Sequence, residues 1–236
     1  MAAANERGIL VANAGYRSTP TIELTWALIL ASARHLVGES DSIRAGGWQT
    51  SVGHELDGRV LGVLGLGNVG GQVARIGRAF GMKIIAWSQN LTAGTAAAAG
   101  AELVTKDELF RRADIVTIHL ILSERTRGLV GAAELALMKP TARLINTSRG
   151  PIVDEQALIE VLRARAIAGA AVDVFDTEPL PTKHPFRSLE NLLATPHIGF
   201  VAEDLYRTFY GGRGGGDRSM DRGAGSEPVS IRRNEA

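Results

Sequence analysis

The sequence contains no cysteine, and this absence excludes several kinds of site at once. Without thiols the chain can have no disulfide framework, no cysteine nucleophile and no thiolate metal site. The five histidines do not fall at the spacing of paired metal ligands, so the sequence predicts no metal site. A chain without cysteine also fits a cytoplasmic protein, which is the location that we predict.

An excess of charge of one sign and long apolar runs are lacking as well. The 26 basic and 25 acidic side chains leave a net charge of +1, which gives no electrostatic reason to expect nucleic acid or a membrane surface as a partner. The longest helical apolar stretch, residues 24–33, is too short to span a bilayer. Residues 1–7 lack the basic start and the apolar run of a signal peptide, so we expect no export.

The composition that remains is typical of a globular α/β protein. The 236 residues are 45% apolar and 22% charged, which is enough for one sizeable α/β domain with additional fragments. Strand and helix signals alternate as in a doubly wound parallel sheet of the Rossmann type. The candidate strands are residues 59–64, 83–87, 101–104, 115–120, 142–146, 169–174 and 192–194.

Three helix starts can be located from the sequence. Thr19 and Pro20 begin a helix that runs to about residue 35, with proline in the first turn. Apolar residues lie nearly all round this helix, so we expect other parts of the protein to cover both of its sides. Thr105 begins a capping box, and Asp154 can cap a helix over residues 155–164.

A glycine motif at residues 65–70 gives the clearest indication of function. It follows the apolar strand at residues 60–64 and opens an amphipathic stretch, which is the strand, turn and helix that a dinucleotide pyrophosphate requires. Gly65 permits the tight turn, Gly67 lets backbone N–H groups approach the phosphates, and Gly70 lets helix and strand pack closely. The alternative is a glycine turn in an ordinary α/β core.

Three downstream segments narrow the chemistry. They are Asn146-Thr147-Ser148-Arg149-Gly150, residues 173–180 (DVFDTEPL) and residues 195–199 (TPHIG). With the glycine motif, in this order and spacing, they resemble the D-isomer-specific 2-hydroxyacid dehydrogenases, which include lactate, phosphoglycerate, glyoxylate and hydroxypyruvate enzymes. The resemblance covers roughly residues 8–210 and implies reversible hydride transfer between a nicotinamide cofactor and a small 2-oxo or 2-hydroxy acid.

The resemblance assigns three catalytic residues. Arg149 would hold the substrate carboxylate, His197 would be the acid/base, and Glu178 would be the carboxylate paired with His197. Each type suits its task, because a guanidinium matches a carboxylate bidentately and an imidazole titrates near neutrality. Taken singly, these residues could instead be a loop arginine, the end of a strand and a solvated turn acid.

The resemblance also implies the contacts to the cofactor. Thr126 would approach it from a loop, Thr147 would contact the nicotinamide half, and Asp173 would accept a hydrogen bond from the carboxamide. His119 would end a strand at the cofactor crevice, although it could equally be a packed histidine. The expected cofactor-binding residues are Gly65, Gly67, Asn68, Val69, Gly70, Ser88, Gln89, Asn90, His119, Thr126, Thr147, Ser148, Arg149, Asp173, His197 and Gly199.

The end of the second strand bears on the choice of cofactor. Folds that prefer NAD place an acidic residue there for the ribose hydroxyls. Here Ser88 occupies that position and is followed by Gln89 and Asn90, which can donate hydrogen bonds to a 2′-phosphate. No arginine completes the site. We therefore expect NADP preference or use of both NADP and NAD.

Both ends depart from the family pattern. Residues 5–13 resemble the last strand of a substrate domain whose earlier part is missing, and residues 203–210 resemble the start of its return helix. Residues 211–236 have little apolar content, so we expect them to be disordered. They look more like a non-native C-terminus, as from a frameshift or fragment boundary, than like an RGG-type nucleic-acid segment.

We divide the chain accordingly and keep two functional classes open. The segments are a substrate-domain remnant (1–17), a junction or dimer helix with a linker (18–57), the dinucleotide-binding domain (58–200), the return helix (201–210) and the tail (211–236). The first class is an oxidoreductase, a homodimer in its intact form. The second is a catalytically incomplete cofactor-binding fragment or a dinucleotide-sensing module. We expect the chain as written to bind cofactor but to reduce 2-oxo acids slowly or not at all.

Overall fold

The computed structural model describes residues 6–7 and 15–210. The described residues divide into two units, one with residues 6–7, 15–17 and 201–210 and the other with residues 18–200. In the first unit, residues 203–210 are helical, as the sequence predicts. The predictions for residues 8–13 and for the tail at 211–236 lie outside the described residues.

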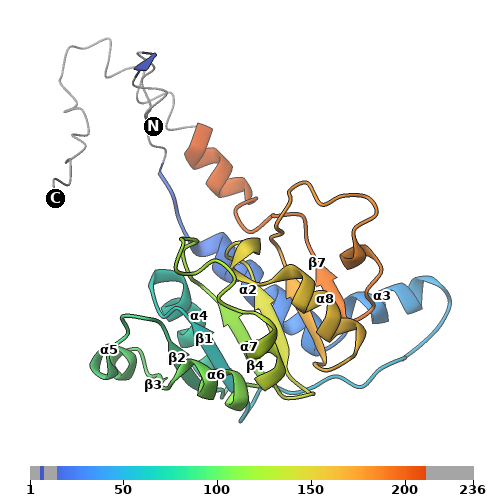
Figure 1. The fold of residues 1–236 in the computed structure, drawn as a ribbon. Coiled ribbons are helices and arrows are strands. Elements are labelled where there is room, and N and C mark those ends of the chain that lie inside the picture. The colour runs from blue at the N-terminus through green and yellow to red at the C-terminus, as the bar shows by residue number, and fades with distance from the viewer. Residues whose placement is uncertain (1–5, 8–14, 211–236) are drawn as a thin grey trace. The chain divides into compact units, whose positions relative to one another are not determined.

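The second unit is built on one sheet of seven parallel strands in the order β3-β2-β1-β4-β5-β6-β7 (Figure 1). This is the predicted doubly wound fold, in which the strand order reverses direction between β1 and β4. The central strands consist of consecutive apolar residues, because helices cover both faces of the sheet and bury the side chains on each side. The strands are β1 (Val60–Leu64), β2 (Lys83–Trp87), β3 (Glu102–Leu103), β4 (Ile115–Ile118), β5 (Arg143–Asn146), β6 (Gly169–Val172) and β7 (Leu192–Ala194).

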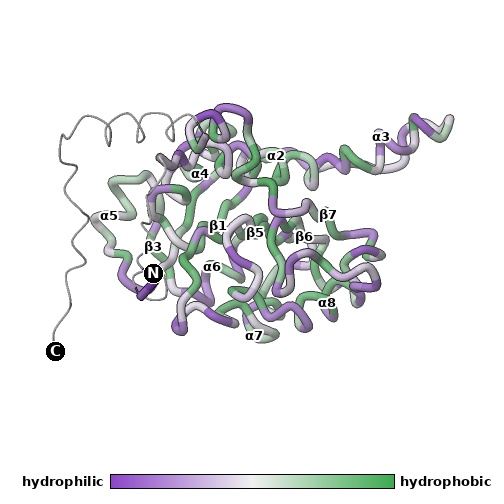
Figure 2. The backbone as a smooth tube through the Cα atoms, turned by 90° about the horizontal axis from the view of Figure 1, so that it is seen from above, coloured by the Kyte–Doolittle hydropathy of each residue, from purple (hydrophilic) through white to green (hydrophobic). Residues whose placement is uncertain are grey.

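Helices form a layer on each side of the sheet, as Figure 2 shows. One face is covered by α2 (Thr19–Ala33) and α4 (Asn68–Ala79), and the other by α6 (Lys106–Arg112), α7 (Ala132–Leu137) and α8 (Glu155–Arg163). Each face has its own apolar core, with Trp26 and Ile29 on the α2 side and Phe110 and Leu144 on the other. The remaining elements of this unit are α3 (Leu36–Arg44), α5 (Ala93–Ala98) and the 3₁₀ turns η1 (Gly150–Ile152) and η2 (Pro185–Arg187).

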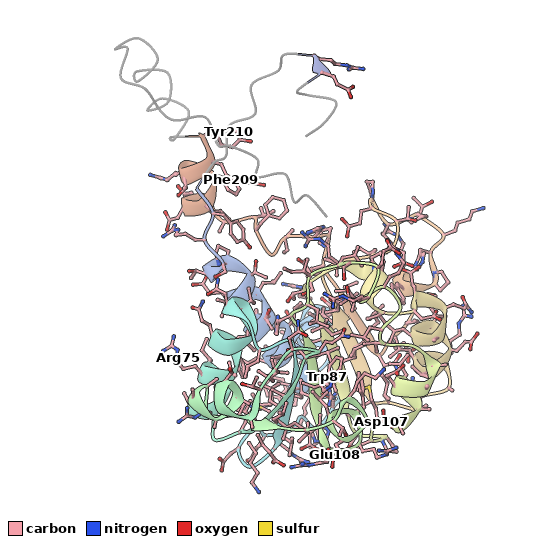
Figure 3. All side chains as sticks on the ribbon, turned by 60° about the vertical axis from the view of Figure 1, so that its left-hand side comes forward. Arg75, Trp87, Asp107, Glu108, Phe209 and Tyr210 are labelled. Atoms are coloured by element: carbon pink, nitrogen blue, oxygen red, sulfur yellow. The ribbon has the colours of Figure 1, made fainter. Side chains whose placement is uncertain are left out.

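The predicted caps are present. Thr105 accepts a hydrogen bond from the Glu108 backbone N–H, and the Glu108 carboxylate accepts one from the Thr105 N–H, which completes the capping box of α6. Asp154 accepts a hydrogen bond from the Ala157 N–H and so caps α8. In Figure 3 Glu108 lies at the outer surface, whereas Trp87 lies among the side chains of the sheet.

Some element boundaries differ from the prediction. We expected a linker after residue 35, but residues 36–44 form α3, none of whose side chains is buried. This helix was not predicted, because a helix without a buried apolar face has no apolar periodicity in its sequence. The strands β4 and β6 each end two residues earlier than predicted, so His119 and Asp173 follow their strands. Within the described ranges, no helix is long and apolar enough to cross a lipid bilayer.

Candidate active site

The predicted site residues gather at the carboxyl edge of the sheet. Past the ends of the strands, the backbone N–H groups of His119, Asp173 and Thr195 still donate to neighbouring strands, at 2.8 Å to Leu64 O, 2.9 Å to Asn146 O and 2.9 Å to Val172 O. Parallel strands share this edge, and in doubly wound sheets ligands bind where the strand order reverses. The structure therefore brings segments that are far apart in the sequence to the edge at which this fold binds ligands.

The glycine turn at this edge leaves room only for glycine at two positions. Gly65 has a positive φ of 101°, and a Cβ there would lie 2.5 Å from His119 O. A Cβ at Gly70 would lie 2.0 Å from Gly65 O, so α4 packs directly onto the turn. A Cβ at Gly67, by contrast, would meet nothing within 4 Å. The turn is thus closely packed on the protein side and open on the side where a phosphate would lie.

These features fit a dinucleotide. The twelve-residue helix α4 begins at Asn68, and its first N–H groups have no partners within the helix, which suits a pyrophosphate. The side chain of Asn68 is not directed at a charge, since its Nδ2 donates to Ser18 Oγ at 3.2 Å. Val69 is half-buried and belongs to the α2-side core.

The predicted ribose segment lies beside the glycine turn. Gly65 N–H donates to Trp87 O at 2.9 Å, and Leu91 N–H closes a turn on Ser88 O at 3.1 Å. This turn holds Ser88, Gln89 and Asn90 directly after β2. Gln89 and Asn90 are exposed and Ser88 is half-buried, so all three side chains are accessible in part. The segment offers neutral hydrogen-bonding groups where many relatives of this fold offer a carboxylate.

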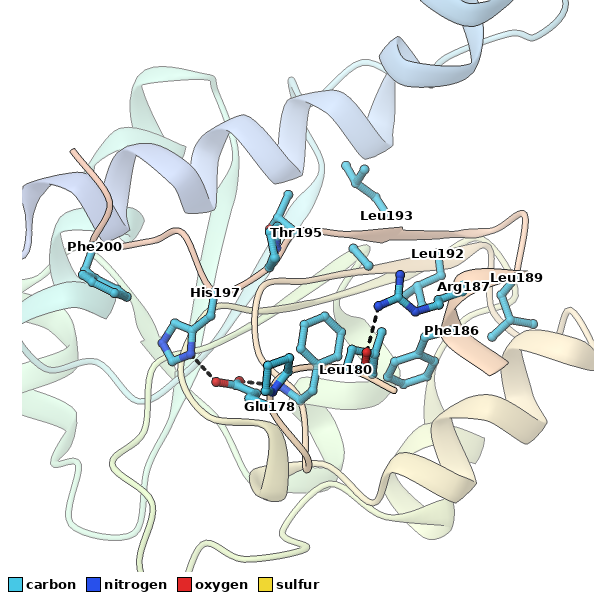
Figure 4. A pocket seen from close by; sticks show the side chains of 14 residues that line it. Glu178, Leu180, Phe186, Arg187, Leu189, Leu192, Leu193, Thr195, His197 and Phe200 are labelled. Atoms are coloured by element: carbon cyan, nitrogen blue, oxygen red, sulfur yellow. Dashed lines mark hydrogen bonds and ion pairs between the residues drawn. The ribbon is translucent and has the colours of Figure 1, made fainter. Parts of the chain in front are cut away.

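His197 and Glu178 form a close pair. His197 Nδ1 lies 2.6 Å from Glu178 Oε2, and the other carboxylate oxygen accepts a hydrogen bond from Phe175 N–H at 2.9 Å (Figure 4). Burial raises the pKa of Glu178, but the hydrogen bonds from His197 and Phe175 and the charges of His197 and Arg149 outweigh it and lower the pKa below its ordinary value. The ionised carboxylate fixes Nδ1, which leaves Nε2 for a second partner.

Asp173 holds the loop that carries His197. Its Oδ1 accepts from Thr195 Oγ1 at 2.6 Å and from Ile198 N–H at 2.9 Å, and its Oδ2 accepts from Gly199 N–H at 2.8 Å. His197 has a left-handed backbone with φ of 54°, which is costly for a residue other than glycine. Asp173 is 1% exposed and stabilises this conformation through the backbone on one side of His197 and Thr195 on the other.

Asn146 shapes the loop that carries Arg149. Its side-chain amide donates to Arg149 O and accepts from Ser148 N–H, both at 3.0 Å, and Ser148 Oγ donates to Ile118 O at 3.0 Å. The Arg149 side chain is exposed and donates to Ser148 O at 2.6 Å. Because its charge lowers the pKa of Glu178, the guanidinium lies within electrostatic reach of the His197–Glu178 pair.

Two threonines one turn apart on α2 connect these loops. Thr21 Oγ1 donates to Gly199 O at 3.1 Å, and Thr25 Oγ1 lies 2.8 Å from Thr147 Oγ1. Thr25 also donates its single hydroxyl proton to Thr21 O at 2.7 Å, so the proton between the two hydroxyls belongs to Thr147. The Thr147 hydroxyl therefore has no proton left to donate to a ligand, and it can act only as a hydrogen-bond acceptor.

His119 and Thr126 already have partners within the protein. His119 Nε2 lies 2.9 Å from Thr117 Oγ1, and burial lowers the pKa of His119 to about 3. The ring is therefore neutral at neutral pH. Thr126 Oγ1 donates to Ile121 O at 2.7 Å and accepts from Ser123 N–H at 2.8 Å, which closes its loop.

An apolar pocket of about 960 Å³ adjoins the histidine pair (Figure 4). Phe175, Leu180, Phe186 and Leu192 line it, with Glu178 and His197 on its wall. A second histidine–carboxylate pair, His184 Nε2 with Glu155 Oε1 at 2.9 Å, packs edge-on against Phe186. It resembles the first pair in that one imidazole nitrogen lies close to one carboxylate oxygen.

Comparison with known proteins decides the family. Residues 26–199 match the sequence model described as D-isomer specific 2-hydroxyacid dehydrogenase, NAD binding domain. The chain belongs to this family. It is 45% identical over 211 residues to a glyoxylate reductase from Aeropyrum pernix, covering 85% of this chain and 63% of that protein. The chain thus spans less than two thirds of this dehydrogenase's length.

Solved dehydrogenase structures show the same fold. A phosphoglycerate oxidoreductase from Vibrio cholerae superimposes with a TM-score of 0.87 at 35% identity, over 93% of this chain and 72% of that one. A D-lactate dehydrogenase from Aquifex aeolicus, solved with NAD and lactic acid, superimposes with a TM-score of 0.79 at 26% identity, over 94% and 72%. The doubly wound, NAD-binding fold is therefore established for this chain.

Sequence reasoning missed the supports of the site. It assigned Asp173 to the cofactor but did not foresee its three bonds to the His197 loop, and it did not single out Thr21 or Thr25. The signal for the threonines was available, because their hydroxyls at i and i+4 lie on one face of a mostly apolar helix. The partners, however, lie far away in sequence.

Proposed function

We propose that this chain carries the cofactor-binding and proton-transfer half of an oxidoreductase that interconverts small 2-oxo acids and D-2-hydroxy acids. The observation that carries the proposal is the 2.6 Å pair of His197 and Glu178, held at the same sheet edge as the glycine turn. A dinucleotide turn alone would support only binding. A histidine at the same sheet edge, whose Nε2 has no hydrogen-bond partner among the described residues, supports proton transfer.

The proposed roles rest on the family resemblance and are supported by the hydrogen bonds of these residues. Arg149 binds the carboxylate of the acid with its planar guanidinium and so orients the carbonyl carbon. His197 Nε2 gives a proton to the carbonyl oxygen during reduction and takes it back during oxidation. Glu178 stays ionised, fixes the tautomer of the ring and stabilises its charged form. A bound nicotinamide supplies the hydride.

The proposed cofactor contacts rest on the same placement. Gly65, Gly67, Asn68, Val69 and Gly70 cradle the pyrophosphate with backbone groups. Thr147 offers an acceptor to the nicotinamide half. We retain Ser148, Arg149, Asp173, His197, Gly199, His119 and Thr126 as predicted contacts on the grounds of their position at this edge.

Cofactor choice is the first testable detail. We propose NADP preference or dual use, because Ser88, Gln89 and Asn90 present no negative charge to a 2′-phosphate. Ser88→Asp should lower affinity for NADPH relative to NADH by about 10- to 100-fold, since the new carboxylate repels the phosphate and binds the ribose hydroxyls instead. Fluorescence titration of both reduced cofactors measures the ratio. Ser188→Asp, on an exposed turn, is the control; a wild-type protein that strongly prefers NADH would contradict the proposal.

Loss of the Glu178 carboxylate tests its role. Glu178→Gln should lower kcat/KM for reduction by about 10-fold or more, because His197 Nδ1 loses the charged partner at 2.6 Å that fixes the ring. Steady-state kinetics with glyoxylate measure the change. Glu155→Gln, in the second pair with His184, should leave kcat/KM close to that of the wild type. An unchanged kcat/KM in Glu178→Gln would remove Glu178 from the mechanism.

The function itself is tested by pairing a binding measurement with turnover. Binding of NADPH or NADH should change the fluorescence of the protein or of the cofactor. Oxidation of the reduced cofactor should depend on added glyoxylate or hydroxypyruvate. Reduction that requires Arg149 would support the oxidoreductase. Saturable cofactor binding without reduction of any 2-oxo acid would favour the alternative, a catalytically incomplete fragment or a dinucleotide-sensing module.

We also propose that the intact protein is a cytoplasmic homodimer. The segment after α2 extends away from the sheet in Figure 2 and exposes Leu36, Ile43, Trp48 and Val52, the last two being 79% and 81% exposed. A cluster of exposed apolar side chains on one projecting segment is typical of an interaction surface. Sedimentation equilibrium measures the state of assembly.

A further inference from the structure

A buried arginine stands apart from the site described above. Arg143 is the first residue of β5, is only 6% exposed, and lies at the amino edge of the sheet, at the opposite end of the strands from His197. Among the described residues, the only hydrogen-bonding partner of its guanidinium is His35 Nε2, at 3.5 Å. A guanidinium is a permanent cation, and burial without a counter-charge is costly.

Among the described residues, no acid forms an ion pair with Arg143. Asp114, which precedes the adjoining strand β4, binds Lys139 Nζ at 2.8 Å and accepts from Val60 N–H at 2.8 Å, and Glu55 is exposed. Burial lowers the pKa of Arg143. The guanidinium is thus a buried cation without a carboxylate partner in the part of the chain that the structure describes.

Arg143 faces a cavity of about 650 Å³ between the junction of α2 with α3 and the amino ends of β6 and β7; we call it the Arg143 cavity. Two acids line it, but Glu190 pairs with Arg165 at 2.8 Å and Asp41 pairs with Arg44 at 3.1 Å. Glu39 accepts hydrogen bonds from Thr50 and Ser51, which line the cavity too. Arg143 is thus the buried charge of the wall that has no ion-pair partner among the described residues. The volume is that of a small-molecule site.

Further groups on the other side of Arg143 add to the positive potential. Arg143, Arg59 and His54 line a second, smaller cavity of about 70 Å³ together with Asp114 and Glu55. The pKa of His54 is lowered by burial and then by the charges of Arg143, Arg59 and His35. A histidine whose charged form is disfavoured in this way reports a locally positive field.

The backbone at His35 is held in a costly conformation beside this cavity. His35 is a non-glycine residue with φ of 51°, and it separates α2 from α3. That conformation turns the chain sharply and places the imidazole next to the guanidinium. Costly backbone conformations persist where the surroundings enforce them and often mark ligand sites.

We propose that the Arg143 cavity binds a small anion, a carboxylate or a phosphate, through the guanidinium of Arg143. The planar fork of the guanidinium matches either group bidentately, and a low-dielectric wall strengthens the interaction. The site is at the amino edge of the sheet, so it is distinct from the cofactor and substrate positions at the carboxyl edge. The proposal is independent of the proposed function.

Thermal unfolding of the 236-residue chain with inorganic phosphate tests the proposal. Ligands that bind only the folded state raise the melting temperature, by about 4 °C at ten times Kd for a chain of this size. Sodium chloride at equal ionic strength gives the baseline. We expect a larger saturable rise with phosphate in the wild type than in Arg143→Met, which keeps the volume and removes the charge. Any phosphate bound at the glycine turn should raise the melting temperatures of both chains alike. Arg111→Met, in an exposed pair with Asp107, should respond as the wild type does.

Several results would overturn the proposal. The first is a wild-type chain whose melting temperature and titration calorimetry show no saturable response to phosphate or citrate, which needs no variant to fold. The second is an Arg143→Met chain that responds like the wild type. The third is a wild-type dimer that phosphate does not stabilise and that Arg143→Met converts to a monomer. The counter-charge of Arg143 would then come from a second copy of the chain. Arg143→Lys should keep part of the response, because it retains the charge without the fork.

Discussion

His197→Asn is expected to lower kcat by about 10²- to 10⁴-fold in any active form of this protein, while the affinity for the reduced cofactor stays close to that of the wild type. Asparagine cannot give and take a proton near neutral pH. The backbone at position 197 should persist, because Asp173 holds the flanking segments and asparagine tolerates φ of 54° better than most residues. Steady-state kinetics with glyoxylate and fluorescence titration of NADPH measure the two quantities.

The chain contains a matched control for this variant. His184 pairs with Glu155 at 2.9 Å, much as His197 pairs with Glu178 at 2.6 Å, but its ring packs edge-on against Phe186. His184→Asn should affect stability rather than kcat. A His197→Asn enzyme with near-normal kcat would show that another group transfers the proton.

Gly70→Ala is expected to lower cofactor affinity at least about tenfold and to reduce the free energy of unfolding by about 1–3 kcal/mol. The new Cβ would lie 2.0 Å from the carbonyl oxygen of Gly65, so either α4 or the turn must move. The turn carries the N–H groups that face the pyrophosphate, and its displacement therefore weakens binding directly. Urea denaturation and fluorescence titration measure the two effects.

The neighbouring glycine separates helix propensity from steric conflict. Gly71 is also in the first turn of α4, but a Cβ there would meet nothing within 4 Å. Gly71→Ala should leave cofactor affinity unchanged and stabilise the fold by roughly 0.5–1 kcal/mol, because alanine favours the helix. Equal effects of the two substitutions would contradict the packing argument.

Much of the architecture was predictable from local patterns. Buried strands such as residues 60–64 and 83–87 read as short apolar runs, and the caps at Thr105 and Asp154 depend on residues only three positions apart. The helix α3 was not predictable, because it has no buried face and hence no apolar periodicity. The strands β4 and β6 were predicted to end two residues too late, because an apolar run does not show where the backbone hydrogen bonds between strands stop.

The sequence by itself determined the doubly wound fold, the glycine turn and the family pattern that points to Arg149, Glu178 and His197, because those signals lie in short contiguous segments. Only the tertiary structure decided how these residues are held. The bonds from Asp173 to the His197 loop, the contacts of the α2 threonines and the contact of Arg143 with His35 join residues that are up to 178 positions apart. Such contacts depend on which strands and helices become neighbours, and no local spacing of residues encodes that.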